Sequence, residues 1–186
     1  VGWSMSVGSI ERSTKYAAPQ YTDNDLFVIT LKGVSIPLAM EDDEYRLKYE
    51  GLFLRIVKNS NDTWQATDKE GTQYYFGLTA DSKLDGIGGT FRWHLDRIQD
   101  ANGNYMSFSY WKDHANGGAV YLERIDYTGH INGQRPYNSV EFIREANPRP
   151  DIQTSYAAYF KVVTAYRIVA IDVTADQDRV RAYQLG

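Results

Sequence analysis

A short pattern that turns the chain back on itself recurs in this sequence of 186 residues. Each copy places glycine three residues after aspartate, as in WQATDKEGTQYYF (64–76), LDRIQDANGNYMSF (95–108) and LERIDYTG (122–129). An aspartate side chain can bond the backbone two residues further on, and glycine adopts the positive φ that closes a hairpin. The pattern therefore predicts structural turns at three Asp–Gly pairs, formed by Asp68, Gly71, Asp100, Gly103, Asp126 and Gly129.

Strand signals dominate the rest of the chain. Aromatic residues, which favour pleated and half-buried surfaces, make up 14% of it. The strand candidates are 25–31, 51–57, 105–111, 139–145, 160–166 and 167–173. The first two carry apolar residues on both faces and are predicted to be buried on both sides. In 105–111 the alternation predicts one buried face, made of Met106, Phe108 and Tyr110.

No stretch has the spacing of an amphipathic helix, and only 152–160 is a candidate for a short one. We therefore expect an all-β fold with little or no helix. Successive antiparallel hairpins would form a curved sheet or part of a β-rich shell, because one hairpin buries little surface alone. Residues 1–186 are expected to form a single β-rich module, as a fragment of a much longer chain.

Charge and composition exclude several classes of function. The net charge is −4 and the basic residues are scattered, so no nucleic-acid partner is expected. The chain has no cysteine, which excludes disulfides and thiol nucleophiles. No apolar run reaches the roughly 18 residues of a membrane span, so none is expected.

Two pairs of carboxylates are candidates for acid and base in glycoside hydrolysis. Asp96 with Asp100, or Asp100 with Glu123, would need to lie about 5–9.5 Å apart across a cleft. The repeat offers a simpler role for Asp100 as a turn residue and gives Asp96 no role. We therefore expect no catalytic residue in this chain.

Metal and cofactor signals are weak. Asp23, Asn24 and Asp25 are close in sequence, and 41–44 is acidic throughout, but neither stretch has the spacing of an EF-hand. Both are interpreted as solvated acidic loops. The three histidines, His94, His114 and His130, have no ligand spacing, and the glycine-rich stretches 2–9 and 86–90 lack a phosphate-binding pattern. The sequence predicts no metal site and no cofactor.

The aromatic residues leave an alternative function open. Five of them could line a sugar-binding surface, namely Trp64, Tyr74, Trp93, Tyr105 and Trp111. Large rings also fill β cores, which is the interpretation we favour for most of them. A carbohydrate-binding or glycosidase-like domain is therefore the first alternative, and a cell-surface adhesin or interaction domain is the second.

Blocks along most of the chain resemble the virulence-plasmid B-type proteins. The blocks, in order, are GWSMSVGSIERSTK, YTDNDLFVITLKG, YRLKYEGLFLRIV, WQATDKEGTQYYFG, FRWHLDRIQDANGNYMSFSYWKD, YLERIDYTGH and TAYRIVAIDV. Proteins of this family share a region with the B components of bacterial insecticidal toxin complexes. The Asp-x-x-Gly hairpins are also similar to those of Rhs, or YD-repeat, proteins.

The resemblance implies a structural role. Proteins of this kind build β-rich shells from hairpins wound side by side, and the shell encloses a toxic C-terminal polypeptide. This chain would form part of the shell wall and would be non-enzymatic, with any enzymatic activity in regions that it lacks. Its partners would be the remainder of its parent chain or shell and other toxin-complex subunits. Its location would be secreted or on the bacterial cell surface.

Overall fold

The computed structural model of the chain describes residues 7–22, 24–42, 44–49 and 51–185. Within these residues the chain consists of β-strands, turns and one short 3₁₀ segment, η1 (His114–Asn116), with no α-helix. The expectation of an all-β fold is confirmed. The expectation of a short helix over 152–160 is wrong, because this stretch contains strand β13 (Gln153–Ser155) and turns in which Ala158 is the one buried residue, so it has no apolar stripe to bury.

Eight strands close into a ring, which we call the barrel. Each strand pairs antiparallel with the next, and the ring closes because β1 pairs with both β2 and β9. Closure removes the two free edges that an open sheet of these strands would have. The barrel strands are β1 (Ser9–Arg12), β2 (Phe27–Leu31), β3 (Val34–Glu41), β4 (Glu44–Leu47), β5 (Arg55–Asn59), β6 (Thr63–Thr67), β7 (Gln73–Phe76) and β9 (Gly89–Gln99).

Aromatic rings fill the barrel. Trp64 and Trp93 are fully buried, and their ring centroids lie 5.7 Å apart. Phe27 packs edge-on against Trp64, with 4.9 Å between the centroids. These rings come from three different strands, so this packing ties together parts of the ring that are distant in sequence. Aromatic pairs of this geometry contribute about 0.5–1.5 kcal/mol beyond the area that they bury.

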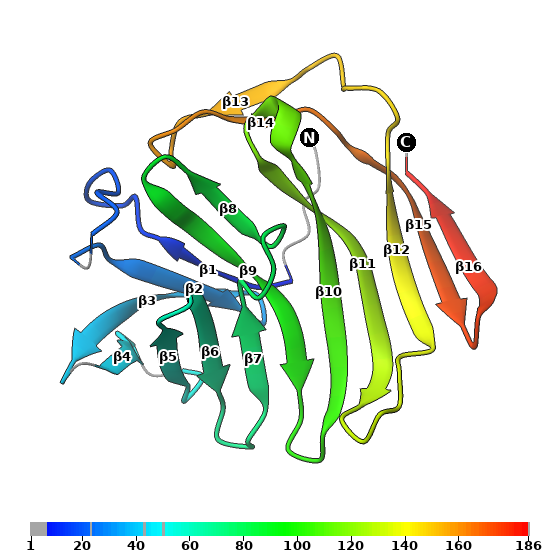
Figure 1. Cartoon of the computed structure of the whole chain (residues 1–186), viewed down its shortest axis with the longest axis horizontal. Helices are drawn as coiled ribbons and strands as arrows, with labels where there is room; N and C mark the ends of the chain where they lie inside the picture. The colour runs from blue at the N-terminus through cyan, green and yellow to red at the C-terminus, as the bar shows by residue number, and fades with distance from the viewer. Residues whose placement is uncertain (1–6, 23, 43, 50, 186) are drawn as a thin grey trace.

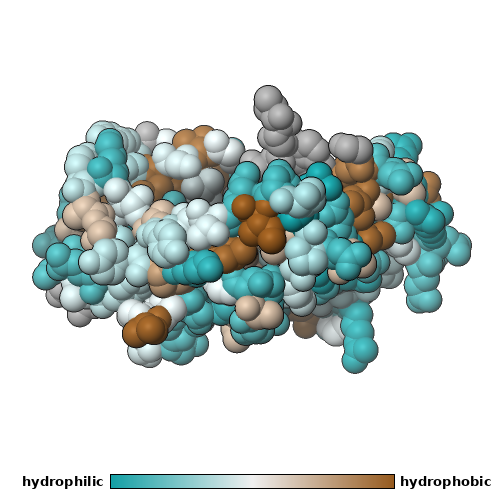
Figure 2. Space-filling view, turned by 90° about the horizontal axis from the view of Figure 1, so that it is seen from above, coloured by the Kyte–Doolittle hydropathy of each residue, from teal (hydrophilic) through white to brown (hydrophobic). Residues whose placement is uncertain are grey.

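The rest of the sheet extends from the barrel as an open sheet, which we call the wing (Figure 1). Its strands lie in the order β10 (Asn104–Asp113), β11 (Ala119–His130), β12 (Asn138–Arg144), β15 (Ile168–Ala175) and β16 (Asp178–Gln184). Burial decreases outward, since all of β15 is partly buried and all of β16 is exposed. Figure 2 shows hydrophobic residues in separate groups among hydrophilic ones, including a group toward the wing.

Strand β9 joins the barrel to the wing because it has different neighbours along its two halves. Around Trp93 it pairs with β1 on one edge and with β8 (Lys83–Gly86) on the other. Around Ile98 it pairs with β10 and β7. The sheet therefore forks at Leu95, where the neighbour on one edge changes from β1 to β10. The N–H of Leu95 donates to the carbonyl of Gly8 at 3.1 Å, and its carbonyl accepts a hydrogen bond from the Tyr110 hydroxyl at 2.6 Å.

The segment between β12 and β15, which we call the strap, crosses back over the barrel (Figure 1). Its strands β13 and β14 (Val162–Thr164) form a separate two-stranded sheet. A Cβ on Gly86 would lie 2.5 Å from the ring of Phe160, so the strap packs directly on β8. The Tyr21 hydroxyl also donates to the carbonyl of Ala158 in the strap.

Two details of the predicted burial are wrong. Segment 51–57 is not buried on both sides, because β5 begins only at Arg55 and Ile56 is its one buried residue. In β10, Phe108 and Tyr110 are buried as predicted, but Met106 is 36% exposed. Met106 lies in the half of β10 that is closer to the turn, where the strand is less buried. None of the helices within the described residues is long and apolar enough to cross a membrane.

The fork yields a stability prediction. We expect Tyr110→Phe to lower the free energy of unfolding by about 1–3 kcal/mol, because it leaves the buried carbonyl of Leu95 without its donor. Urea unfolding followed by tryptophan fluorescence measures the change. Tyr156→Phe, which removes a hydroxyl from an exposed ring of the strap, is the control and should change stability by less than about 0.5 kcal/mol. Equal effects of the two substitutions would contradict the role assigned to the Tyr110 hydroxyl.

Candidate functional site

The first Asp-x-x-Gly stretch forms the turn between β6 and β7. The Oδ1 atom of Asp68 accepts hydrogen bonds from the backbone N–H of Glu70 at 3.1 Å and of Thr72 at 2.9 Å. Its Oδ2 atom accepts one from the Tyr74 hydroxyl at 3.0 Å. Gly71 closes the turn with a φ of 83°, which glycine adopts without strain. The carboxylate thus binds both the turn and the strand that follows it.

Asp68 is buried but remains a good acceptor. Burial alone would raise the pKa of its carboxyl group. The hydrogen bonds from Thr72 and Tyr74, together with the charge of Lys32, outweigh burial and lower this pKa below its ordinary value. Asp68 is therefore ionised in the folded protein at neutral pH.

The second Asp-x-x-Gly stretch forms the turn between β9 and β10 in the same way. The Oδ1 atom of Asp100 accepts from the backbone N–H of Asn102 at 2.9 Å and of Asn104 at 2.8 Å, and Gly103 has a φ of 90°. The side-chain amide of Asn104 donates to Oδ2 at 2.7 Å, and this hydrogen bond holds the pKa of Asp100 below its usual range.

The third pair differs from the prediction. Asp126 and Gly129 lie inside β11, where the strand continues to His130, so they form no turn. The carboxylate of Asp126 accepts from Nε of Arg124 at 2.8 Å on the surface. Gly129 is paired with Tyr105, and a Cβ on Gly129 would lie 2.4 Å from the Tyr105 ring. The glycine is thus explained by the close approach of an aromatic ring and not by a turn.

The third turn of this kind comes at 130–134, which the sequence pattern missed. The N–H of Asn132 donates to Nδ1 of His130 at 3.1 Å, and Gly133 has a φ of 104°. The N–H of His130 donates to the carbonyl of Gln134 at 2.9 Å. The Asn-Gly pair in HINGQ was the available signal, because Asn-Gly is a strong turn sequence. The Asp-x-x-Gly pattern does not mark this turn because histidine stands in the position of the aspartate, although 130–138 has the composition of a loop.

The three turns lie side by side at one end of the sheet. A Cβ on Gly71 would lie 3.3 Å from the Cβ of Ala101, and a Cβ on Gly103 would lie 2.6 Å from Cγ1 of Ile131. The N–H of Ile131 also donates to the carbonyl of Gly103 at 3.0 Å. The turns therefore form a contiguous row, which links the barrel to the wing.

Asp96, to which the repeat gives no role, lies at the other side of the fork. Its carboxylate accepts from the backbone N–H of Leu78 at 2.7 Å and from the hydroxyl groups of Ser82 at 2.9 Å and Thr79 at 3.3 Å. Burial raises the pKa of Asp96 despite these hydrogen bonds. Asp96 thus holds the loop between β7 and β8 in place, at the point where the neighbour of β9 changes from β7 to β8.

The carboxylate pairs do not have the geometry of a glycosidase. Asp96 and Asp100 are four residues apart along β9 and its turn, which corresponds to roughly 13 Å. Glu123 lies on β11 roughly 23 Å from His130, which pairs with Asn104 beside the Asp100 turn. These backbone separations exceed the range of about 5–9.5 Å that the reaction needs between carboxyl groups. The carboxylates of Asp96 and Asp100 are also held by different loops, the first by the loop between β7 and β8 and the second by its own turn.

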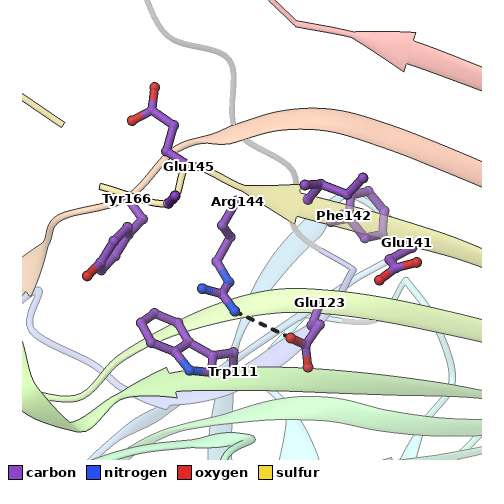
Figure 3. A pocket seen from close by; sticks show the side chains of 9 residues that line it. Trp111, Glu123, Glu141, Phe142, Arg144, Glu145 and Tyr166 are labelled. Atoms are coloured by element: carbon purple, nitrogen blue, oxygen red, sulfur yellow. Dashed lines mark hydrogen bonds and ion pairs between the residues drawn. The ribbon is translucent and has the colours of Figure 1, made fainter. Parts of the chain in front are cut away.

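A cavity of about 420 Å³ lies on the wing. It is lined by Trp111, Glu123, Glu141, Phe142, Ile143, Arg144, Glu145, Ala146 and Tyr166. Figure 3 shows Arg144 above the ring of Trp111 and directed at Glu123, whereas Glu145 points away from them. The guanidinium carbon is 3.8 Å from the centre of the Trp111 ring, and Nη2 donates to Oε1 of Glu123 at 3.4 Å. This stacked ion pair holds β10, β11 and β12 together.

The aromatic residues do not form an open sugar-binding surface. Trp64, Tyr74 and Trp93 lie in the barrel core. Tyr105 has the guanidinium of Arg97 at 4.0 Å from its ring centre, and one face of Trp111 is covered by Arg144 in the same manner. Of the five predicted residues, the two that lie outside the barrel core thus already stack against cations of the chain itself.

The predicted solvated loop around Asp25 is instead an ordered ion pair. Asp25 accepts hydrogen bonds from Arg12 at 2.5 Å and from the backbone N–H groups of Gln20 at 3.0 Å and Tyr21 at 2.7 Å. Burial alone would raise the pKa of Asp25, but these donors lower it. Asp23, Asp43 and residues 2–6 of the glycine-rich opening lie outside the described residues. Among the residues that the structure does describe, no three His, Asp or Glu side chains are grouped to hold a metal ion.

The other two histidines also have ordinary surroundings. Burial lowers the pKa of His94 to about 3, and the charge of Arg92 adds to this effect, so His94 is neutral. His114 lies 3.6 Å from Asp81 on the surface. Neither arrangement contains a nucleophile.

Residues 1–167 match the family described as Salmonella virulence plasmid 65kDa B protein. The chain belongs to this family. Its sequence is 28% identical over 182 residues to proteins named Mono(ADP-ribosyl)transferase SpvB from Salmonella choleraesuis (strain SC-B67) and from Salmonella enteritidis. The match covers 82% of this chain and 30% of each relative, so the chain spans less than a third of the length of these relatives.

Solved structures of this family and of toxin complexes share the fold. The N-terminal domain of effector protein SpvB from Salmonella typhimurium strain LT2 matches with a TM-score of 0.79 and 18% identity, covering 93% of this chain and 77% of that domain. The Photorhabdus luminescens Tc holotoxin pore matches with a TM-score of 0.75 and 17% identity, covering 93% of this chain and 11% of that chain. TcdB2-TccC3 matches with a TM-score of 0.74 and 16% identity, covering 93% and 12%. The resemblance to virulence-plasmid B-type and toxin-complex B proteins is thus confirmed.

The expectation of a non-enzymatic protein is contradicted by the same relatives. Both curated relatives carry the name of an enzyme, a mono(ADP-ribosyl)transferase. The expectation combined the absence of a catalytic motif with the resemblance to a shell protein, and neither gives information about the part of the relatives that this chain does not match.

The turn geometry yields a second prediction. We expect Asp68→Ala to lower the free energy of unfolding by about 2 kcal/mol, because two backbone N–H groups and the Tyr74 hydroxyl lose their acceptor. Since the pKa of Asp68 is lowered on folding, its contribution is present above about pH 4 and is lost as the pH falls further. The difference in stability should therefore shrink in acid.

Asp126→Ala is the matched control for this experiment. It removes an aspartate from the same sequence pattern, but one that makes only a surface ion pair with Arg124. Chemical denaturation measures the free energy of unfolding of both variants. We expect Asp126→Ala to change this free energy by less than about 0.5 kcal/mol. Equal losses for the two variants would show that the turn bonds do not determine the effect.

Proposed function

We propose that the chain is a structural module of a toxin-complex type of protein, in which the barrel anchors a wing whose outer edge pairs with further strands. Residues 1–186 act as one unit in this proposal, because one sheet runs from β1 to β16. The observation that carries the proposal is the free edge of β16. The shared fold of the toxin-complex structures supports it.

The edge strand β16 has unused hydrogen-bonding capacity. Within the described residues it pairs only with β15, and all seven of its residues are exposed. The N–H of Leu185 donates inward to the carbonyl of Val169 at 2.9 Å. Because donors alternate along an antiparallel strand, the N–H groups of Ala182 and Gln184 point outward. An edge of this kind is a template for another strand.

The charge pattern of β16 disfavours a second copy of the chain as that partner. Arg181 lies at the centre of Asp178–Gln184, so it would face its own copy in a symmetric antiparallel pair. Like charges directly opposite each other destabilise strand pairs. The edge is better suited to a different strand, contributed by the remainder of a longer parent chain or by another toxin-complex subunit.

The finer parts of the proposal concern a longer protein that contains this chain. In this proposal the module is the β-rich scaffold of a protein with mono-ADP-ribosyltransferase activity, and its wall encloses or supports a polypeptide of the same protein. The protein is secreted or lies on the bacterial surface, consistent with similar structures that are named as an effector protein and a toxin.

The test compares amide hydrogen exchange in this chain with that in a longer protein that contains it. We expect the outward amides of Ala182 and Gln184 to exchange rapidly in the isolated chain and at least tenfold more slowly in the longer protein. In the longer protein, Ala182→Pro should remove the protection of the Gln184 amide. In the isolated chain the same substitution should leave the stability unchanged, because Pro is tolerated where an edge N–H faces outward. Ala182→Ser, which keeps the N–H, is the control.

Equal exchange of these two amides in both proteins would refute the pairing edge. A protease assay then tests enclosure separately. If the wall shields a polypeptide, that polypeptide should resist cleavage in the wild-type longer protein and become sensitive in Ala182→Pro. Sensitivity in both would refute enclosure and leave the pairing edge standing.

A further inference from the structure

The strap carries a strand edge that is separate from the edge of β16. Its strands β13 and β14 pair antiparallel, with Thr154 opposite Val163. The far side of β14 is occupied, because a Cβ on Gly117 would lie 2.7 Å from the carbonyl oxygen of Lys161, just before that strand. Strand β13 pairs with β14 alone among the described residues, and all three of its residues are exposed. Its free edge therefore lies at the outside of the molecule (Figure 1).

The composition of β13 does not protect this edge against pairing. Exposed edges are usually protected by a charge, a proline or a bulge. Gln153, Thr154 and Ser155 are uncharged, and their register with β14 is continuous. The nearby carboxylate of Asp151 is already neutralised, because the guanidinium of Arg149 donates two hydrogen bonds to it, at 2.7 and 2.5 Å. Another strand can thus pair with β13 without burying an unpaired charge.

A second copy of the same strand fits this edge. When two copies pair antiparallel about Thr154, each Thr154 lies opposite its counterpart and Gln153 lies opposite Ser155. The flanking Ile152 then lies opposite Tyr156. Pairs of threonines, and pairs of an aromatic with a β-branched residue, are favourable cross-strand neighbours. No like charges are opposed in this register, in contrast to the corresponding pairing of β16.

The side chains beside the strand add an apolar contact. Ile152 and Tyr156 are 52% and 65% exposed. Because side chains alternate along a paired strand, both lie on the same face as Thr154. Pairing would cover Ile152 of each copy with Tyr156 of the other, and tyrosine is a residue enriched in protein interfaces.

Neighbouring registers are less favourable. A register centred one residue earlier would bring Pro150 into the pairing, and proline has no N–H to donate. A register centred one residue later would place Ile152 opposite Ala158, which is buried in the cluster that the strap forms with β8 and β9. The register centred on Thr154 is the one that pairs the three strand residues with one another.

We propose that β13 is the interface of a weak symmetric homodimer, in which the strands of two copies pair antiparallel about Thr154. The two small sheets then form one sheet, in the order β14, β13, β13 and β14. Such an interface uses the same surface on both copies, so it closes at two copies. The inference does not depend on the proposed function, because it uses neither β16 nor a longer protein.

The test measures self-association of the chain by sedimentation velocity at increasing concentrations. So short an interface should give a dissociation constant of about 0.1–1 mM. In NMR spectra recorded on dilution, the amide shifts of Gln153, Thr154 and Ser155 should change, whereas those of β16 should not. A chain that stays monomeric up to about 1 mM, or shifts that change elsewhere instead, would overturn the proposal.

Substitutions at the symmetry axis sharpen the experiment. Thr154→Lys and Thr154→Glu each place like charges directly opposite one another, so each variant alone should be monomeric in this concentration range. A mixture of the two should form a heterodimer, because opposite charges then face each other. Val180→Lys, which adds a charge at an exposed position of β16, is the control and should dimerise as the wild type does.

Tryptophan fluorescence verifies that each variant is folded. If the mixture of folded Thr154→Lys and Thr154→Glu failed to associate, or if Thr154→Lys alone dimerised like the wild type, pairing about Thr154 would be refuted. Loss of the dimer in Val180→Lys would place the interface on β16 and would refute the proposal as well.

Discussion

The fold depends on the hydrogen bonds of one strand, β9, which belongs to the barrel and the wing at once. A strand has two edges, and each buried backbone group on them needs a partner. Where β1 gives way to β10, the carbonyl of Leu95 would lack a donor, and the Tyr110 hydroxyl supplies it. Where β7 gives way to β8, the carboxylate of Asp96 binds the intervening loop. A side chain thus completes the ladder of β9 at the first place. At the second, His94 bonds the backbone of Gly77 and Ser82, and Asp96 holds the loop between these two residues.

Local chemistry was readable from the sequence, whereas long-range pairing was not. The turns at Asp68 and Asp100 follow from bonds within five residues, and the alternation of β10 correctly marks Phe108 and Tyr110 as buried. The pattern failed at Gly129, because glycine is also used where a ring such as Tyr105 approaches the backbone. The pairing of β1 with β9 joins residues about 80 positions apart and leaves no local signal.

The division into a barrel and a wing gives the molecule two different surfaces. The strands of the barrel close on one another and bury Trp64 and Trp93 in a core that Phe108 and Tyr110 of the wing also join. The wing loses burial strand by strand until β16 is exposed throughout. The relatives that this chain matches are longer than the chain, and its fold recurs within toxin-complex structures.

The closure of the barrel by β1 and β9 is most directly tested by disulfide trapping, since the chain has no cysteine of its own. Glu11 and Arg92 are direct partners in this pairing and form an ion pair. Cysteines at directly opposite positions fall within the Cα separation that a disulfide requires. The structure predicts that Glu11→Cys with Arg92→Cys oxidises almost completely to an intramolecular disulfide in the folded protein, while Glu11→Cys with Thr90→Cys does not. The closed barrel would be contradicted if the cysteines at positions 11 and 92 stayed reduced, or if those at positions 11 and 90 oxidised efficiently instead.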